Sequence, residues 1–188
     1  MRLSTRLRAM LEGPEIVVLP GAYDALTARL AERAGFGAVF TTGFGFAATV
    51  LGVPDYGLLT MSETLDRVRH IVRTLSVPLV ADMDTGYGNP LNVVRTVREC
   101  VALGVGGIIL EDQEWPKKCG HFEGKRVIPA EEQAQKLRAA ADARAGDDLV
   151  IIGRTDARQP LGLEEAVRRA KLYRDAGADV VFVEAPRS

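Results

Sequence analysis

Two aspartates, Asp82 and Asp84, are the first residues of this chain whose types and spacing suggest chemistry. They follow residues 78–81, a short apolar run typical of a buried strand. Alternate residues of a strand point to the same side, so we expect both carboxylates on one face. Buried like charges repel each other and lose their hydration, and a divalent cation resolves both problems. Oxygen ligands of this kind favour Mg²⁺, with Mn²⁺ as an alternative, whereas helix capping by Asp84 or simple surface solvation would need no metal.

Polar side chains also follow other apolar runs. Glu111 follows residues 107–110, Arg154 stands shortly after residues 149–152, and Glu184 follows residues 180–183. An arginine among carboxylates is typical of a clamp for an anionic substrate, although a structural ion pair explains Arg154 equally well. Asp55, taken by itself, is typical of a turn.

A long polar loop, residues 114–126, separates the fourth apolar run from the helical stretch that follows. Its length exceeds a minimal strand-to-helix connection and predicts a lid over the site. Within it Cys119 stands beside two lysines and two positions before His121. Nearby positive charge favours the thiolate and makes a thiol a usable proton donor or acceptor. A zinc site is not indicated, because the sequence offers no further Cys/His pair.

Short apolar runs alternate with amphipathic stretches along the chain, and this alternation predicts an α/β fold. The expected strands are residues 16–19, 38–40, 78–81, 107–110, 149–152 and 180–183, and helices are expected at residues 63–74, 91–103 and 164–176. Continuous apolar strands bounded by Gly or Pro are what a parallel sheet buried on both faces requires. A glycine repeated before residues 38, 107 and 180 is typical of a helix that ends just before a strand.

Two architectures fit this alternation, an open doubly wound sheet and a closed (β/α)8 barrel. The first run is not followed by the Gly-x-Gly-x-x-Gly of dinucleotide-binding folds. Polar residues at the ends of the strands favour the barrel, because barrel enzymes place their sites there. A complete barrel takes eight strands and ~250 residues. We therefore predict one TIM-type barrel domain over residues 1–188, truncated after strand 6, in preference to a smaller sheet.

Composition narrows the possible partners and the compartment. The chain has 188 residues, a formal net charge of -1 and 47% hydrophobic residues, which fits one globular domain and gives no sign of nucleic-acid binding. No apolar run reaches the roughly 18 residues of a membrane span, and the N-terminal segment does not look like a secretory signal. Two cysteines do not make a disulfide framework, so we predict a cytoplasmic protein. Cys100 and His70, both on expected helices, are interpreted as structural.

Six segments in order along the chain resemble motifs of the isocitrate lyase/phosphoenolpyruvate mutase superfamily. They are residues 51–55, 82–88, 111–113, 117–121, 154–157 and 183–186. The run Lys-Lys-Cys-Gly-His at residues 117–121 looks like the lyase signature, and residues 111–121 look closest to 2-methylisocitrate lyases and 2-alkylmalate (dimethylmalate) lyases. Phosphonomutases and oxaloacetate decarboxylases of the family generally lack this cysteine, whereas its oxaloacetate hydrolases can retain it.

The resemblance implies a role for each matching residue. It implies Mg²⁺ bound by Asp82, with Asp55, Asp84 and Glu111 acting through water. It implies Cys119, His121 and Arg154 as catalytic residues. The implied substrate contacts are Thr42, Gly43, Phe44, Asp82, Lys117, Lys118, Gly120 and Glu184. The bulky Phe44 departs from the small Ser-Gly-Gly turn of methylisocitrate lyases and leaves the substrate open. The resemblance further implies an eight-stranded barrel and a homo-oligomer, which in the family is a tetramer.

The implied reaction is Mg²⁺-dependent cleavage of a carbon–carbon bond. The substrate would be a 2-hydroxy di- or tricarboxylate, and the products a 2-oxo acid and a carboxylic acid, with Cys119 as proton donor. One alternative is an oxaloacetate hydrolase, a decarboxylase or a phosphonomutase on the same scaffold. Another, of a different class, is an inactive truncated remnant or a binding protein.

Overall fold

The computed structural model describes residues 1–186. Six strands in this part of the chain form one parallel sheet in the order β1-β2-β3-β4-β5-β6. The strands are β1 Gly21–Ala22, β2 Val39–Thr41, β3 Leu79–Asp82, β4 Gly107–Glu111, β5 Val150–Thr155 and β6 Val180–Val183. Every strand pairs with the next one along the chain, as in a parallel barrel. Within residues 1–186, β1 and β6 do not pair, so the sheet is not closed.

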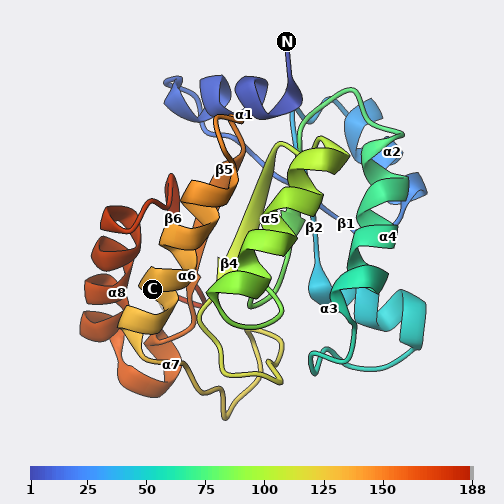
Figure 1. Cartoon of the computed structure of the whole chain (residues 1–188). Helices are drawn as coiled ribbons and strands as arrows, with labels where there is room; N and C mark the ends of the chain where they lie inside the picture. The colour runs from blue at the N-terminus through green and yellow to red at the C-terminus, as the bar shows by residue number, and fades with distance from the viewer. Residues whose placement is uncertain (187–188) are drawn as a thin grey trace.

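Helices cover the outer face of this sheet (Figure 1). The helices of the described chain are α1 Leu3–Glu12, α2 Ala25–Arg33, α3 Gly43–Phe46, the π-helix η1 Ala47–Leu51, α4 Met61–Val72, α5 Pro90–Leu103, α6 Ala130–Ala143, α7 Arg158–Leu161 and α8 Leu163–Asp175. Helix α1 crosses the end at which the strands begin, and the long loops gather at the opposite end (Figure 1). The predicted α/β alternation is therefore confirmed.

Helix α5 shows how local sequence sets these boundaries. Asn89 caps its first turn by accepting from the backbone N–H of Leu91 at 2.9 Å, and Pro90 occupies the first helical position, where no N–H is needed. At the other end Gly104 takes the left-handed conformation, with φ 76°, that stops the helix. The strand β4 begins three residues later.

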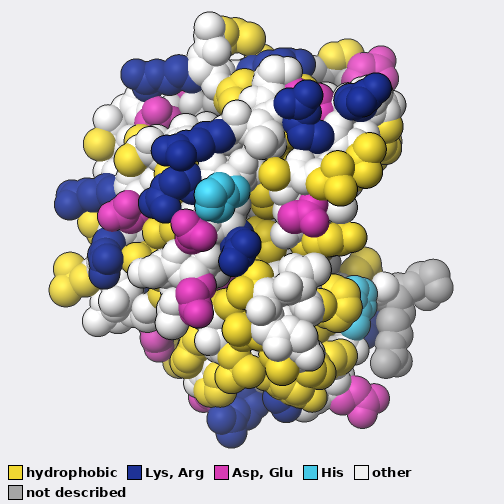
Figure 2. All heavy atoms as spheres, turned by 90° about the vertical axis from the view of Figure 1, so that its right-hand side faces the viewer, with side chains coloured by type: hydrophobic (Ala, Val, Ile, Leu, Met, Phe, Trp, Pro, Cys, Tyr) yellow, Lys and Arg dark blue, Asp and Glu magenta, His cyan; other side chains and the backbone are white. Residues whose placement is uncertain are grey.

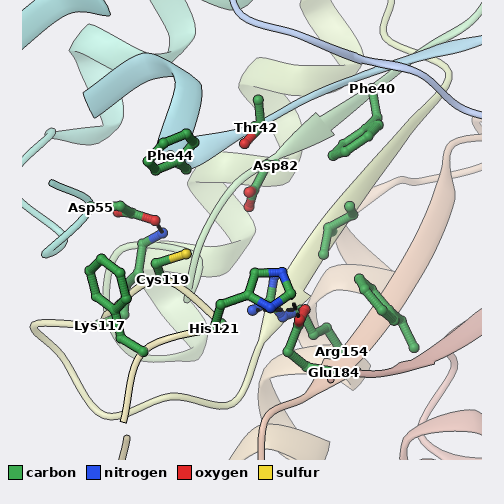
Figure 3. Close-up of a pocket in the computed structure, with 14 residues that line it drawn as sticks. Phe40, Thr42, Phe44, Asp55, Asp82, Lys117, Cys119, His121, Arg154 and Glu184 are labelled. Atoms are coloured by element: carbon green, nitrogen blue, oxygen red, sulfur yellow. Dashed lines mark hydrogen bonds and ion pairs between the residues drawn. The ribbon is translucent and has the colours of Figure 1, made fainter. Parts of the chain in front are cut away.

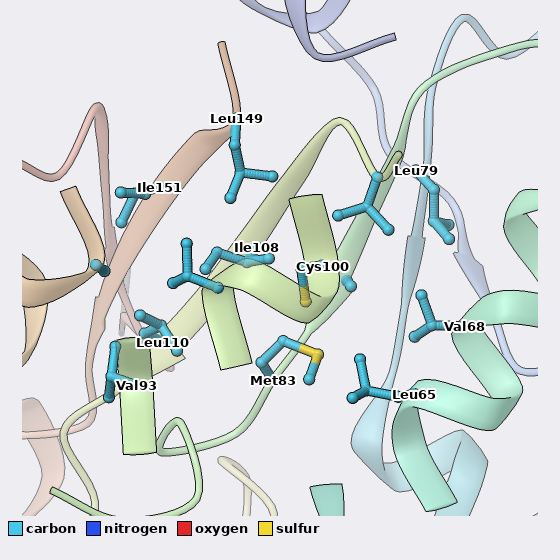
Figure 4. Packing of buried hydrophobic residues seen from close by; sticks show 14 of the residues in the cluster. Leu65, Val68, Leu79, Met83, Val93, Cys100, Ile108, Leu110, Leu149 and Ile151 are labelled. Carbon is cyan, nitrogen blue, oxygen red and sulfur yellow. The ribbon is translucent and has the colours of Figure 1, made fainter. Parts of the chain in front are cut away.

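Strand alternation separates a packed outer layer from an inner face that carries the polar residues. Ile108 and Leu110 of β4 are fully buried and pack toward the helices, as Figure 4 shows. Ile109 and Glu111 point the other way, and Ile109 belongs to a separate inner cluster with Leu7 of α1. The parallel register pairs Glu111 with Arg154. The inner face is thus apolar near α1 and polar where the strands end.

The prediction that residues 16–19 form the first strand was wrong. The segment that pairs with β2 is Gly21–Ala22, and Gly21 lies opposite Phe40. Ile16 is 90% exposed and Val18 is 58% exposed, whereas Val17 packs against the inner cluster. Val17 and Leu19 thus pack on the inner cluster without pairing with a strand, so the apolar character of this run reflects packing and not strand formation.

The face formed by α2 and α4 carries basic, acidic and apolar side chains side by side (Figure 2). Arg69 lies 3.4 Å from Asp66, and His70 lies 3.8 Å from the same carboxylate. His70 is thus an exposed surface residue, whereas Cys100 is fully buried in the core, as expected. Among the described residues, no helix combines the length and apolar character needed to cross a bilayer.

Asp179, the residue before β6, connects three elements and generates a prediction about acid stability. It accepts hydrogen bonds from Arg8 of α1 at 3.0 Å, from Arg144 at 2.6 Å and from the backbone N–H of Ile151 at 2.9 Å. Burial opposes its ionisation, but these donors outweigh burial and hold the pKa of Asp179 below its usual value of 3.8. Its contribution to stability is therefore complete above pH 3.8 and is lost as the pH falls through the lower folded-state pKa.

We expect Asp179→Asn to flatten the loss of stability below about pH 4, because the titrating group is removed. Urea unfolding followed at several pH values measures this slope. The exposed Asp66→Asn variant serves as the control and should keep the parent slope. An unchanged acid slope in Asp179→Asn would show that Asp179 does not govern it.

Candidate active site

A cavity of about 510 Å³ lies where the strands end, between the inner face of the sheet and the loop of residues 114–126. Its polar lining consists of Thr42, Asp55, Asp82, Lys117, Cys119, Gly120, His121, Arg154 and Glu184. Figure 3 shows these side chains facing one another from different strands and loops. The remaining lining is apolar and includes Phe40, Phe44 and Phe182. Most of the residues singled out in the sequence therefore share one cavity.

Asp82, the last residue of β3, joins this strand to the loop after β2. Its Oδ2 accepts from the backbone N–H of Gly43 at 3.1 Å, and its Oδ1 accepts from the N–H of Asp84 at 3.1 Å. The backbone N–H of Asp82 in turn donates to the Thr41 hydroxyl at 2.9 Å. The side chain is only partly buried and faces the cavity (Figure 3).

Asp84 lies close to Asp82, but not for the reason expected from strand alternation. The strand ends at Asp82, and Asp84 sits in a turn with φ 49°, a left-handed conformation that Asp tolerates better than most residues. Its carboxylate is buried, and burial raises the pKa of Asp84 to about 6 despite the attraction of Lys117. Asp84 Oδ1 accepts no hydrogen bond from any described residue, although Lys117 Nζ lies 2.6 Å away.

Lys117 reaches from the loop into this group of acids. It is 4% exposed, and its Nζ donates to Asp55 Oδ2 at 2.7 Å. Burial opposes its charge, but the surrounding carboxylates, Asp84 foremost, outweigh burial and raise the pKa of Lys117 above its usual value. Lys117 is thus a fixed counter-ion for Asp55 and Asp84.

The surroundings of Gly43 allow a test of the predicted magnesium site. A small cavity of about 10 Å³, with room for about one water molecule, is lined in part by Asp55, Asp82, Asp84 and Gly43. A Cβ at Gly43 would stand 2.9 Å from Lys117 Nζ and 3.1 Å from Asp84 Oδ1, so only glycine leaves this space open. Among the described residues, no three His, Cys, Asp or Glu side chains converge as a ready ligand set. Mg²⁺ keeps several waters and uses one or two carboxylates, so the room for a hydrated ion lies in the cavity of about 510 Å³, which Asp55 and Asp82 also line.

Glu111 and Asp112, adjacent at the end of β4, point to opposite sides. Glu111 faces inward, is 1% exposed, and places Oε2 3.4 Å from Arg154 Nε. Its Oε1 has no hydrogen-bond partner among the described residues, and burial raises the pKa of Glu111 well above its usual value. Asp112 faces outward and accepts from Tyr173 of α8 at 2.6 Å and from Arg169 at 3.0 Å. Of the two, only Glu111 therefore faces the site, where it contacts Arg154 but lines neither cavity.

Arg154 of β5 is both ion-paired and available to a ligand. Its Nε and Nη2 donate to the two oxygens of Asp156 at 2.9 and 3.1 Å, and Nη2 also lies 3.1 Å from Glu184 Oε2. The guanidinium carbon lies 5.5 Å from the centre of the Phe182 ring. Nη1 donates no hydrogen bond to another described residue, and the side chain lines the cavity. The two interpretations of Arg154 are thus compatible, since structural ion pairs orient the group that lines the cavity.

The segment Cys119–His121 lies across the cavity from Asp82 (Figure 3). The Cys119 N–H donates to the Asp55 carbonyl at 3.0 Å, and the Cys119 carbonyl accepts from Phe122 N–H at 2.9 Å. The His121 side chain is 79% exposed, with Nε2 3.9 Å from Glu184 Oε1. These contacts place the thiol and the imidazole on the rim of the cavity.

Lys118 is the one predicted substrate contact that lies outside both cavities. Its Nζ donates to the Gly124 carbonyl at 3.3 Å, while its backbone exchanges hydrogen bonds of 3.0 and 2.8 Å with the Gln113 side chain. Gln113 and Asp156 were given no role from the sequence, yet they hold the loop and Arg154. The available signal was their position directly after the ends of β4 and β5.

Parallel strands whose carboxyl ends surround a polar cavity define the α/β-barrel class of enzymes. Residues 7–188 match the family model described as phosphoenolpyruvate phosphomutase. The chain belongs to this family, within the isocitrate lyase/phosphoenolpyruvate mutase superfamily, which confirms the resemblance. It is 48% identical to 2,3-dimethylmalate lyase of Eubacterium barkeri over 186 residues, and 42% identical to 2-methylisocitrate lyase of Bacillus subtilis over 183 residues. These alignments cover 99% and 97% of this chain but only 64% and 60% of the relatives' lengths.

Solved structures show the same relation. A crystal structure of 2,3-dimethylmalate lyase superposes with a TM-score of 0.96 at 42% identity, over 100% of this chain and 64% of that one. Oxaloacetate acetylhydrolase in complex with 3,3-difluorooxalacetate superposes with a TM-score of 0.96 at 42% identity, over 100% of this chain and 65% of that one. Phosphonopyruvate hydrolase in complex with oxalate and Mg²⁺ superposes with a TM-score of 0.90 at 39% identity, over 100% of this chain and 64% of that one. The six-stranded sheet is therefore the corresponding part of this barrel-type fold.

The close approach at Gly120 generates a prediction about packing. A Cβ there would stand 2.4 Å from Arg154 Nη2 and 2.6 Å from Glu184 Cδ. We expect Gly120→Ala to lower the free energy of unfolding by about 1–3 kcal/mol, because the methyl group must displace the ion pair or the loop. Urea unfolding measures the change. Gly13→Ala is the control, since Gly13 has φ -74° and a Cβ there would stand no closer than 3.3 Å to another atom, the Met10 carbonyl oxygen; a change below about 1 kcal/mol is expected there. Equal effects at the two glycines would contradict the close packing.

Proposed function

We propose that this protein is an Mg²⁺-dependent carbon–carbon lyase of the 2-methylisocitrate or 2-alkylmalate type. It would cleave a 2-hydroxy di- or tricarboxylate to a 2-oxo acid and a carboxylic acid. The observation that carries this proposal is that Asp82, Arg154 and Cys119 line one cavity. An oxygen ligand, a cation for a carboxylate and a proton donor thereby face the same space. The similarity to enzymes named 2,3-dimethylmalate lyase and 2-methylisocitrate lyase supports this reaction.

The carboxylates near Gly43 would hold the ion. Asp82 would bind Mg²⁺ directly, with Asp55, Asp84 and Glu111 acting through bound water. Support comes from Glu111 Oε1, which has no hydrogen-bond partner among the described residues, and from the larger cavity, which Asp55 and Asp82 line. When bound, Mg²⁺ supplies Lewis-acid polarisation of the 2-hydroxyl and carboxylate oxygens.

Arg154 would hold a substrate carboxylate or the developing oxyanion through Nη1. The ion pairs with Asp156 and Glu184 fix its plane before substrate arrives, which is the preorganisation that electrostatic stabilisation requires. Gly120 and His121 would contact the leaving acid, and Glu184 would orient His121. Lys118 would act only through the long-range field of the loop, because its ammonium lies outside the cavity.

Cys119 would complete the reaction as proton donor. As the carbon–carbon bond breaks, its electron pair passes to the carbon beside a carboxylate and spreads onto the oxygens. The Cys119 thiol would protonate this carbon and become a thiolate, while the proton lost from the 2-hydroxyl would pass to a carboxylate of the site and from there, through solvent, restore the thiol. The aromatic lining, Phe40, Phe44 and Phe182, would accommodate an alkyl substituent of the substrate.

Hydrolysis of oxaloacetate is the second candidate function on the same site. It is favoured by the similarity to oxaloacetate acetylhydrolase and by the presence of Cys119 in the loop. Decarboxylation or phosphonate chemistry would use the same carboxylates without the thiol. Assembly into a homo-oligomer and a cytoplasmic location stay predictions.

Removal of the thiol tests the proton donor. We expect Cys119→Ala to lower kcat by about 10²–10⁴-fold, the usual contribution of a positioned acid, with a smaller effect on KM. A pyruvate-coupled assay with 2-methylisocitrate and 2,3-dimethylmalate, together with an oxalate assay with oxaloacetate, separates the candidate reactions. Cleavage that survives Cys119→Ala undiminished excludes the role of the thiol. This chain covers 64% of the length of 2,3-dimethylmalate lyase. The same assays on a chain extended by two strands therefore test the alternative that residues 1–188 alone are an inactive truncated remnant.

Metal removal tests the ion. Excess EDTA should abolish turnover, and added Mg²⁺ should restore it. Asp82→Asn should raise the Mg²⁺ concentration for half-maximal activity at least about tenfold, since one charged ligand is lost. Asp66→Asn on the surface of α4 controls for the change of net charge. Full activity in EDTA would refute the metal requirement.

A further inference from the structure

Lys125 is a buried lysine that the reaction described above does not use. Its side chain is 1% exposed, whereas the next residue in the loop, Arg126, is 79% exposed. Removing an ammonium group from water is costly unless the charge is paired and hydrogen-bonded. The contacts that hold Lys125 inside must therefore compensate for this cost.

Those contacts connect the segment of Cys119 to the end of β5. Lys125 Nζ donates to the Gly120 carbonyl and, at 2.9 Å, to Asp156 Oδ1. The base of the loop is closed separately, because Glu114 N–H donates to the Arg126 carbonyl at 2.9 Å. Lys125 is thus not needed to close the loop; it acts on the part that contains Cys119.

Asp156 gives this contact a rigid attachment. It is fully buried, and its N–H donates to Asp112 Oδ1 at 2.8 Å. Asp112 also accepts from Thr155 at 2.7 Å and from Tyr173 of α8 at 2.6 Å. Asp156 is thus anchored through its backbone to Asp112, whose carboxylate is bonded to both β5 and α8, so the loop must adjust to Asp156 and not the reverse.

The same Asp156 oxygen also orients the arginine. Oδ1 accepts from Lys125 Nζ at 2.9 Å and from Arg154 Nη2 at 3.1 Å. Gly120 lies so close to Arg154 that a Cβ would stand 2.4 Å from Nη2. The loop, through Lys125, and the Arg154 guanidinium are therefore both positioned by the same oxygen of Asp156.

We propose that Lys125 is a positioning residue that fixes Cys119 and His121 relative to Arg154 through Asp156. Lys125 itself lies outside the lining of the cavity and does not touch the reacting atoms. The effect on turnover rests on the proposed function, whereas the effect on the position of the loop does not. The test therefore begins with a measurement that needs no substrate.

The rate at which Cys119 reacts with a disulfide reagent (DTNB) reports the position of the loop. Cys100 is fully buried, so Cys119 is the fast-reacting thiol, and Cys119→Ser confirms this assignment. We expect Lys125→Met to raise the labelling rate at least about tenfold, because a charge-assisted hydrogen bond contributes on that scale to a local equilibrium. Arg126→Met removes the neighbouring cation, which is exposed, and should label within about twofold of the parent.

Unchanged labelling in a folded Lys125→Met chain would overturn the proposal. If Lys125→Met loses cooperative unfolding, Lys125→Gln takes its place: its amide is too short to span both acceptors, and labelling at the parent rate overturns the proposal in the same way. In an active parent, Lys125→Met should lower kcat more than tenfold, with Arg126→Met unaffected. If Lys125→Met labels faster than the parent but the parent itself shows no turnover, the result supports the positioning role and counts against the lyase. Normal turnover combined with unchanged labelling supports the lyase and rejects the role of Lys125.

Discussion

The concentration of carboxylates at one end of the sheet is the constraint on which the site depends. Six acids lie within or directly around the two cavities, and three cations stand among them. The acids are Asp55, Asp82, Asp84, Glu111, Asp156 and Glu184, and the cations are Lys117, Lys125 and Arg154. Each cation contacts at least one of these carboxylates, and two of the three come from the loop of residues 114–126. This loop is held in place largely because its lysines neutralise acids that the strands present.

The parallel register determines which acids are presented. In β4 and β5 the pairing of Glu111 with Arg154 places opposite charges side by side on the inner face. The adjacent Asp112 points outward and ties β5 to α8 through Thr155 and Tyr173. A slip of one residue would exchange these roles and bury Asp112 against the cavity, so the packing of Ile108 and Leu110 against the helices also fixes the chemistry.

Much of this arrangement could be predicted from the sequence, because period and position carry the information. Apolar runs bounded by glycine located β2 to β6, and polar residues after those runs located Asp82, Glu111 and Arg154. What the sequence could not supply depends on turns and on long-range pairing. Asp84 reaches the site through a left-handed turn, and residues 16–19 are apolar without being a strand. Among the loop lysines, Lys117 and Lys125 are buried and Lys118 is not, a difference that sequence spacing does not show.

The balance of charge at the site also supports the proposed combination of an ion and an anionic substrate. With six acids against three cations, the site by itself repels a di- or tricarboxylate. Burial raises the pKa of both Asp84 and Glu111, so a metal-free chain relieves part of the excess by taking up protons. In the proposed lyase, a divalent cation would relieve the same excess without protonating the ligands and would supply the positive charge that a substrate carboxylate needs. Substrate affinity should therefore depend on the ion as strongly as the chemical step does, because Arg154 is already surrounded by carboxylates and cannot attract the substrate alone.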